Sequence, residues 1–276
     1  MHSTVFWSAT AHQKSLEDRL LAAQAGGFDE LSVFPTDVVD IRTSERTVDD
    51  LLASAASLDV SLSILDPFAQ WLPENPAVDT DFDHGEWFAF DEHSFFELGT
   101  AIQPDSITVV ERFSDALDIE VAAECFGRVC DRAATHGWQV HLEFMPFTEI
   151  SDLETAWEIV RRADRPNGGI VFDTLHYYRG TPDDQLLREI PGEKIFRVQV
   201  CDAGPFEGSL REEAIRGRRF PGEGTLDLVH VLGILEDIGG LNSVGIEVFS
   251  EELAGKPARE IGERAGNSLR DVLSNV

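Results

Sequence analysis

Four predicted strands in the second half of the chain each carry an oxygen donor at the carboxyl end. The strands and their donors are 139–144 with Glu143, 169–173 with Asp173, 195–199 with Gln199 and 243–247 with Glu247. Because the carboxyl ends of the strands meet at one rim of a parallel barrel, we expect these four side chains to converge. Three carboxylates and one neutral oxygen suit a hard divalent cation. The sequence therefore predicts a metal site at this rim.

Glu143 lies on the most informative of these strands. Side chains alternate between the two faces of a strand, so His141 and Glu143 share a face, and Pro146 cannot continue the ladder. We expect His141 to be either a hydrogen-bonded histidine of the core or a partner that orients a carboxylate of the metal site. Asp202, which closely follows Gln199, is expected to support the site in the same way.

The rest of the chain repeats a strand, a turn and a helix, which predicts a parallel sheet with right-handed crossovers. Further strands are expected at 5–8, 30–34, 60–65 and 106–110, and helices at 15–25, 47–58, 91–99, 119–136, 151–163, 183–187, 226–238 and 257–273. Eight strands alternating with about eight helices predict an α/β fold, a single (β/α)8 TIM barrel that occupies residues 1–276 as one domain.

The segment 66–84 interrupts this rhythm with three prolines and several aromatic residues. Long irregular loops in compact domains often have a function. One interpretation is a lid over the rim, with Phe68 and Trp71 as an apolar wall for a ligand. The alternative is a surface excursion that packs on a neighbouring helix.

The composition excludes several classes of partner. The 276 residues include 51 acidic and 22 basic side chains, a net charge of −29, so the surface should repel nucleic acid and anionic membranes. No apolar run approaches the roughly 18 residues of a membrane span, and we expect a cytoplasmic protein. Three cysteines argue against a disulfide framework. An acidic, lysine-poor surface is typical of proteins adapted to high salt. A lineage bias toward Arg, Asp and Glu would explain the same composition equally well.

Together these motifs resemble the xylose isomerase-like barrel superfamily, which includes sugar isomerases and epimerases, inosose dehydratases and endonuclease IV. The resemblance extends from the first strand to the last helix and is most specific to the ketose 3-epimerase branch. The matching motifs are the pair Glu143 and Glu149, the run Asp173-Thr-Leu-His176, the loop Arg219-Phe-Pro-Gly-Glu-Gly224, and Glu247 at the last strand.

By this resemblance one divalent metal ion is held by Glu143, Asp173, Gln199 and Glu247, and the substrate contacts Glu149, His176 and Arg219. Gln199 departs from the family pattern, because many relatives have histidine there. An amide oxygen favours Mn²⁺ or Mg²⁺ over Zn²⁺, with Co²⁺ as a further candidate. Relatives are often dimers or tetramers, so a homo-oligomer is a further expectation.

This donor set predicts chemistry on a small polyhydroxy ketone. A metal bound to the hydroxy-ketone polarises the carbonyl and stabilises the enediolate that forms when the neighbouring carbon loses its proton. Glu143 and Glu247 could act from opposite sides, one removing the proton and the other returning one. His176 would orient or protonate a substrate oxygen. The predicted enzyme is an isomerase or epimerase of carbohydrate metabolism.

Three alternatives remain beside this prediction. Loss of a β-hydroxyl from the same intermediate would make the enzyme a dehydratase (a lyase) of the inosose or dehydroshikimate type. A DNA-repair endonuclease needs a three-metal cluster with more strand-end histidines, and the acidic surface does not suit DNA. A non-catalytic barrel is the third alternative, and Gln199 is the feature that favours it.

Overall fold

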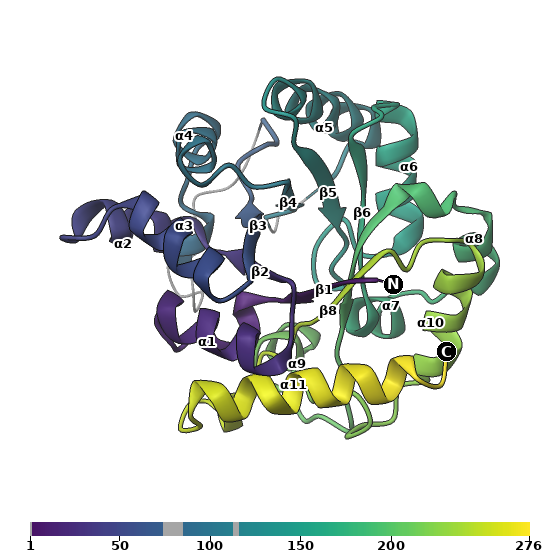
Figure 1. The fold of residues 1–276 in the computed structure, drawn as a ribbon. Coiled ribbons are helices and arrows are strands. Elements are labelled where there is room, and N and C mark those ends of the chain that lie inside the picture. Colours follow the sequence, from purple (N-terminus) through teal and green to yellow (C-terminus); the bar gives the residue numbers. More distant parts are fainter. Residues whose placement is uncertain (1, 74–84, 113–115) are drawn as a thin grey trace.

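The computed structural model describes residues 2–73, 85–112 and 116–276. Strands β1 to β8 pair in parallel and in sequence order, and they close into a barrel surrounded by helices (Figure 1). The strands are β1 Ser3–Phe6, β2 Glu30–Val33, β3 Ser61–Phe68, β4 Ser106–Val110, β5 Gln139–Glu143, β6 Gly168–Asp173, β7 Ile195–Val200 and β8 Ser243–Ile246. This arrangement confirms the predicted TIM barrel.

The helices include three that were not expected from the sequence, which are α2, α7 and α9. The full set in the described residues is α1 Leu16–Gly26, α2 Pro35–Thr43, α3 Val48–Ser57, α4 Glu92–Ile102, α5 Ile119–Ala134, α6 Leu153–Ala163, α7 Thr174–Arg179, α8 Asp184–Glu189, α9 Leu210–Arg216, α10 Leu228–Asp237 and α11 Ala258–Leu273. Short 3₁₀ turns are η1 Ser8–Ala11, η2 Gly85–Phe88, η3 Gly192–Lys194 and η4 Glu251–Leu253.

Each unexpected helix has a clear local cause. Pro35 ends a strand pattern, but it also occupies the first position of α2, where a missing N–H costs nothing. The side chain of Asp173 caps α7 by accepting a hydrogen bond from the backbone N–H of His176. Ser209 and Glu212 form a capping box at the start of α9. Asp173, a strand-end residue of the predicted metal site, therefore also begins a helix.

Strand β3 is longer than predicted, and this overturns the expectation for Phe68 and Trp71. The strand continues to Phe68, whose fully buried ring packs against Phe95 at 4.8 Å between ring centroids. Trp71 donates a hydrogen bond from Nε1 to the carbonyl of Val110 and packs on Phe126. Both aromatic rings belong to the core rather than to a ligand-facing wall. The remainder of the predicted lid, 74–84, lies outside the described residues.

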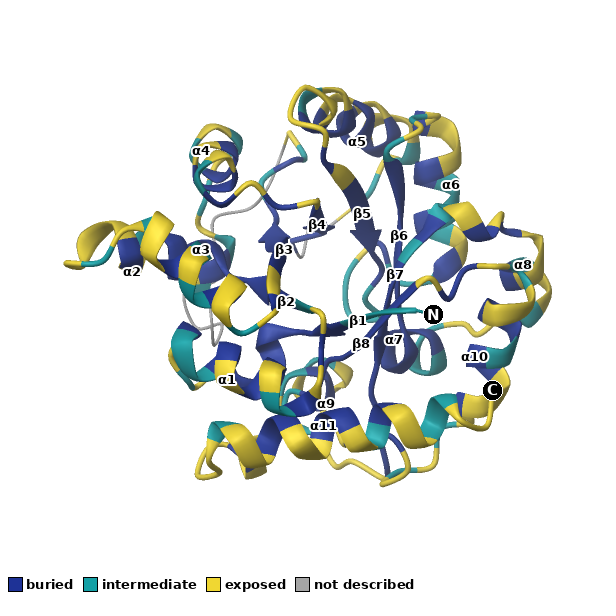
Figure 2. Cartoon of the chain, in the orientation of Figure 1, coloured by how far each residue is buried: buried dark blue, intermediate teal, exposed yellow. Residues whose placement is uncertain are grey.

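Most of the core lies between the strands and the surrounding helices. Figure 2 shows buried residues along the strands and on the inner faces of the helices, with exposed residues on the outer faces. Helices α1 and α11 lie side by side and close the helical ring (Figure 1). Their backbones approach so closely at Gly262 that a Cβ atom there would lie 1.9 Å from the carbonyl oxygen of Ala22. No helix in the described part of the chain is both long and apolar enough to span a bilayer.

The amino end of the barrel interior contains a buried polar cluster. Arg197 lies 3.5 Å from Glu30, which also accepts hydrogen bonds from the hydroxyls of Ser3 and Ser63. His141 is fully buried and its Nε2 lies 3.1 Å from Ser106 Oγ. Burial, and then the charge of Arg197, lower the pKa of His141 well below its usual value. His141 is thus a neutral core histidine hydrogen-bonded to Ser106, one of the two roles expected for it.

Candidate active site

The carboxyl end of the barrel brings the four predicted donors to one region. In the strand register Asp173 lies beside Gln199, and Glu143 pairs with Val171 one strand away. Glu247 follows the last residue of β8 directly. All four side chains are buried, with exposed fractions from 0% at Asp173 and Gln199 to 7% at Glu143. Convergence of the strand ends therefore places three carboxylates and an amide in one buried cluster.

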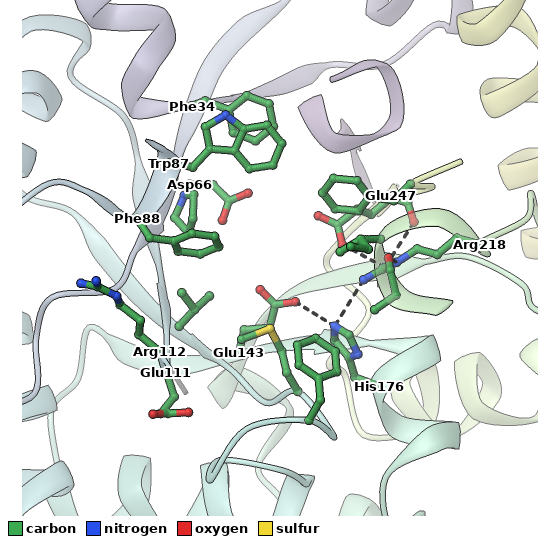
Figure 3. A pocket seen from close by; sticks show the side chains of 17 residues that line it. Phe34, Asp66, Trp87, Phe88, Glu111, Arg112, Glu143, His176, Arg218 and Glu247 are labelled. Carbon is green, nitrogen blue, oxygen red and sulfur yellow. Dashed lines mark hydrogen bonds and ion pairs between the residues drawn. The ribbon is translucent and has the colours of Figure 1, made fainter. Parts of the chain in front are cut away.

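Arg218 lies at the centre of this cluster (Figure 3). Its Nη1 donates to Asp173 Oδ2 at 2.5 Å and lies 2.9 Å from Glu247 Oε2. Its Nη2 lies 3.3 Å from His176 Nε2, which in turn is 3.4 Å from Glu143 Oε1. One guanidinium therefore links carboxylates from two strands to the histidine of α7.

Only one of the two polar atoms of the Gln199 side chain has a hydrogen-bond partner among the described residues. Its Nε2 donates a hydrogen bond to Glu247 Oε1 at 3.0 Å. Its Oε1 is buried and has no hydrogen-bond partner among the described residues. Because an unpaired buried acceptor is costly, this oxygen is suited to a cation or to a ligand donor.

The cluster contains more carboxylates than cationic groups, and this affects the pKa values of its members. Burial raises the pKa of Glu247 well above its usual value; Arg218 opposes this, while Glu143 and Asp173 add to it. Burial also acts to raise the pKa of Asp173, but the charges of Arg218 and His176 outweigh it and lower that pKa. Crowded carboxylates favour either a bound proton or a cation.

Three of these side chains could hold a metal ion together. Ligand atoms of Glu143, Asp173 and His176 lie within 4.8 Å of one another, and all three residues are buried. Two of them belong to the predicted metal set. The third, His176, was expected from the family resemblance to contact the substrate.

Arg218, for which the sequence predicted no role, lies where Arg219 was expected. Arg219 does not line the cavity that contains Glu143; its backbone pairs with that of Asp202 in an antiparallel bridge. Successive side chains of an extended segment point to opposite sides, so Arg218 enters the site and Arg219 faces a separate surface hollow with Arg264. The expectation that Arg219 lies in the site is therefore wrong in its geometry, and Arg218 takes this place.

Two other expected site residues also lie away from the cavity. Glu149 is exposed, and its backbone N–H donates to Glu111 Oε2 at 3.3 Å. Asp202 accepts hydrogen bonds from the backbone N–H groups of Gly222, Gly224 and Leu226. Asp202 thus organises the turn that follows Arg218, rather than touching the cluster itself.

Aromatic residues from separate loops form the apolar walls of the cavity. The Phe34 and Trp87 rings stack at 4.1 Å between centroids, and Phe249 lies 6.2 Å from Trp87. Phe88 (Figure 3) and Phe147 also line the cavity. No sequence motif links these residues, because they meet only when the barrel closes. The cavity is suited to a small ligand with at least one apolar face.

Further polar residues of the cavity follow strands β3 and β4. Asp66, Glu111 and Arg112 line it together with Glu143 and are buried. Sequence reasoning missed them, although a signal existed: Asp66 and Glu111 follow the apolar runs of their strands as Glu143 does. Burial lowers the pKa of Arg112.

Comparison with known proteins gives two groups of curated relatives. A 3-dehydroshikimate dehydratase of Pseudomonas aeruginosa is 28% identical over 94% of this chain and 39% of its own length. An inosose isomerase of Bacillus subtilis is 33% identical over 52% of this chain and 52% of its own length. The chain thus spans about two fifths of the dehydratase and about half of the isomerase.

Solved structures share the fold. A xylose isomerase-like TIM barrel/4-hydroxyphenylpyruvate dioxygenase fusion protein superposes with a TM-score of 0.83 at 21% identity, over 98% of this chain and 42% of that protein. The IOLI protein with a bound zinc atom superposes with a TM-score of 0.82 at 21% identity, covering 99% of this chain and 98% of that one. The model of the family described as xylose isomerase-like TIM barrel matches residues 20–271. The chain therefore belongs to the xylose isomerase-like TIM barrel family.

Proposed function

We propose that this chain is a divalent-metal-dependent enzyme that removes the proton next to the carbonyl of a cyclic hydroxy-ketone, with loss of water as the outcome. The observation that carries the proposal is one buried cluster of Glu143, Asp173, Gln199 and Glu247, of which Glu143 and Glu247 line an apolar-walled cavity. The family membership supports an enzyme of the isomerase or dehydratase type.

The four donors fit a hard divalent cation. Gln199 offers a buried oxygen without a hydrogen-bond partner in the described structure, beside Asp173 on the next strand and Glu247, which its amide group contacts. Such oxygen donors favour Mn²⁺ or Mg²⁺, with Co²⁺ as a further candidate. His176 could replace Gln199 as a ligand, since its ring nitrogen lies near Glu143 and Asp173. A bound cation would polarise the substrate carbonyl and so make the neighbouring proton easier to remove.

The protein's own groups supply the remaining steps. Glu143 and Glu247 come from different sides of the cluster, so either carboxylate could accept the proton from the substrate carbon. His176 is held by Glu143 and Arg218 and would orient a substrate oxygen. Arg218, which links Asp173 and Glu247, would fix the positions of the two carboxylates and stabilise negative charge that develops on oxygen.

Three observations favour loss of water over isomerisation. The dehydratase relatives align over 94% of the chain, whereas the inosose isomerases align over about half of it. The stacked Phe34 and Trp87 rings suit a flat cyclic ligand, and the buried Arg112 is suited to a ligand carboxylate. A cyclic hydroxy-keto acid combines these properties.

A second candidate function is the isomerisation or epimerisation of a ketose or a keto-cyclitol. It is supported by the inosose isomerase relatives, which are 30–33% identical over the part that aligns. The two functions share proton removal by a glutamate and differ in the fate of the β-hydroxyl. If that hydroxyl stays, the proton returns to carbon.

One experiment separates these outcomes. Chelated protein is reloaded with Mn²⁺ and incubated in D₂O with 3-dehydroshikimate, an inosose or a set of ketoses. Loss of water supports the dehydratase, and deuterium in recovered or isomerised substrate without loss of water supports the isomerase. We expect Glu247→Gln to lose both bound metal and turnover, whereas Glu149→Gln, outside the cavity, should keep both. A parent enzyme that binds no metal and exchanges no deuterium would overturn the proposed function.

A further inference from the structure

Asp66 is a carboxyl group of the cavity that the proposed mechanism does not use. It lies near the end of β3, on the side of the cavity formed by Trp87 and Phe88, across from Arg218 (Figure 3). Its exposed fraction is 7%, and its carboxyl is directed into the cavity. Asp66 therefore faces the position of a bound substrate from the side opposite the Arg218 cluster.

Asp66 differs from the carboxylates of Glu143, Asp173 and Glu247 because no described residue forms an ion pair or a hydrogen bond of normal geometry with it. Glu143 contacts His176, while Asp173 and Glu247 contact Arg218. The Thr108 hydroxyl acts to lower the pKa of Asp66, but Thr108 Oγ1 makes no hydrogen bond of normal geometry in the described structure. A buried carboxyl without a partner is costly unless a ligand pairs with it.

The chemical state of Asp66 also suits donation of a proton. Burial, and then the negative charge of Glu143, raise the pKa of Asp66 to about 8. Burial, the larger cause, therefore favours the protonated form of this carboxyl, which faces the cavity. A neutral carboxylic acid can donate a hydrogen bond to a substrate hydroxyl, which an ionised carboxylate cannot do.

We propose that Asp66 is the acid that protonates the hydroxyl lost from the substrate. This inference rests on the proposed dehydration and deepens it. Glu143 or Glu247 takes the proton next to the carbonyl, and the electrons of that C–H bond form the new C=C bond. The C–O bond breaks, its electron pair stays on oxygen, and the proton of Asp66 completes a water molecule. Asp66 regains a proton from solvent while the glutamate releases one.

This assignment separates two measurable events. Removal of the carbon proton needs a glutamate, whereas departure of the hydroxyl needs Asp66. The probe is 3-dehydroshikimate with the Mn²⁺-loaded protein in D₂O, followed for loss of water and for deuterium in unreacted substrate. In Asp66→Asn we expect loss of water to slow by about 10²-fold or more, the range of general acid catalysis. Deuterium exchange should change less than about fivefold, since the glutamates that perform it are intact.

A second measurement excludes a merely structural role. Fluoride leaves without needing a full proton transfer, so an analogue with fluorine in place of the departing hydroxyl should largely bypass Asp66. We expect the Asp66→Asn defect to shrink at least about tenfold on this analogue. A general distortion of the cavity would slow both substrates alike, and thermal unfolding of the variant checks its fold.

The outcomes distinguish this inference from the proposed function. Exchange and water loss that fall together, or an Asp66→Asn variant as active as the parent, would overturn the role of Asp66 alone. A parent protein that neither exchanges deuterium nor releases water would overturn the dehydration itself and the role of Asp66 with it.

Discussion

The barrel interior buries an arginine near each end, and the two environments differ in charge. At the amino end Arg197 lies beside one carboxylate, Glu30, whose oxygens also accept hydrogen bonds from serine hydroxyls. At the carboxyl end Arg218 faces two carboxylates, Asp173 and Glu247, with Glu143 and Asp66 in the same cavity. The first cluster balances its own charge, whereas the second has more acid than one guanidinium can neutralise.

This difference indicates which end is built for a ligand. A buried ion is tolerated when a partner neutralises it, and an uncompensated one costs several kcal/mol, roughly 3–5 in measured cases. At the carboxyl end the shortage of positive charge is reflected in the raised pKa values of Glu247 and Asp66. A proton or a metal cation can supply the missing charge there. The amino-end cluster needs neither and serves the barrel as structure.

The largest expected contrast concerns activity. Glu143→Gln should lower turnover of the Mn²⁺-loaded enzyme by about 10²–10⁴-fold, because it removes a carboxylate suited to accept the substrate proton. Glu30→Gln, at the amino end, should leave kcat/KM within about threefold of the parent under conditions where both are folded. Steady-state kinetics on the same substrate test the pair. Equal losses in both variants would refute the functional division between the two ends.

The next contrast concerns stability without metal. Arg197→Met and Arg218→Met should each lower the free energy of unfolding by about 3–5 kcal/mol, because the first leaves Glu30 and the second leaves Asp173 and Glu247 without a cationic partner. Mn²⁺ should restore much of the loss only in Arg218→Met, since a cation there replaces the missing positive charge. Urea unfolding with and without Mn²⁺ measures this. A similar rescue of Arg197→Met would argue that the effect of the ion is not local.

Metal binding should itself stabilise the parent protein. At a free ion concentration 100 times the dissociation constant, linkage predicts about 2.7 kcal/mol of added stability. Asp173→Asn should abolish this increment, and Ser106→Ala, at the amino end, should keep it. Thermal unfolding across a Mn²⁺ titration provides the test. An increment that survives in Asp173→Asn would place the ion elsewhere.

The metal-free protein should also lose stability as pH rises. The folded pKa of Asp66, about 8, lies above the value of an unfolded aspartate, so the folded state retains a proton that the unfolded state has released. The stabilisation is complete below about pH 4 and declines as pH rises toward 8. Asp66→Asn should flatten this slope in unfolding curves measured from pH 5 to 8. An unchanged slope in that variant would show that Asp66 does not carry the raised pKa.

The smallest expected effect distinguishes the two neighbouring arginines. Arg219 lies outside the cavity. Arg219→Gln should therefore change kcat/KM by less than about threefold, as surface substitutions generally do. Arg218→Lys keeps the charge but loses the planar fork that reaches both carboxylates, so we expect a loss of at least about tenfold. Kinetics of the two variants compare them directly. A larger loss of kcat/KM in Arg219→Gln than in Arg218→Lys would indicate that Arg219, and not Arg218, acts in the site.

Local sequence patterns were sufficient to predict the barrel and the position of its donors. Alternation along 139–144 and an acid before Pro146 identify Glu143 as a strand-end residue, and parallel strands must bring such ends together. The same rule, applied without reference to a family motif, would have found Asp66 and Glu111. The position of a strand and the residue at its end depend on residues that are close in sequence, so a periodic pattern is enough to predict them.

Other features were decided only by the closed barrel. Whether Arg218 or Arg219 enters the site depends on the backbone pairing of Arg219 with Asp202, residues that lie far apart in sequence. The aromatic wall of Phe34 and Trp87 likewise joins separate loops. A strand's period determines which residues share a face, but the path of a loop and the partner of a buried charge depend on long-range contacts. The sequence therefore determined the barrel and its ring of strand-end donors, and the tertiary structure decided which side chains complete the site.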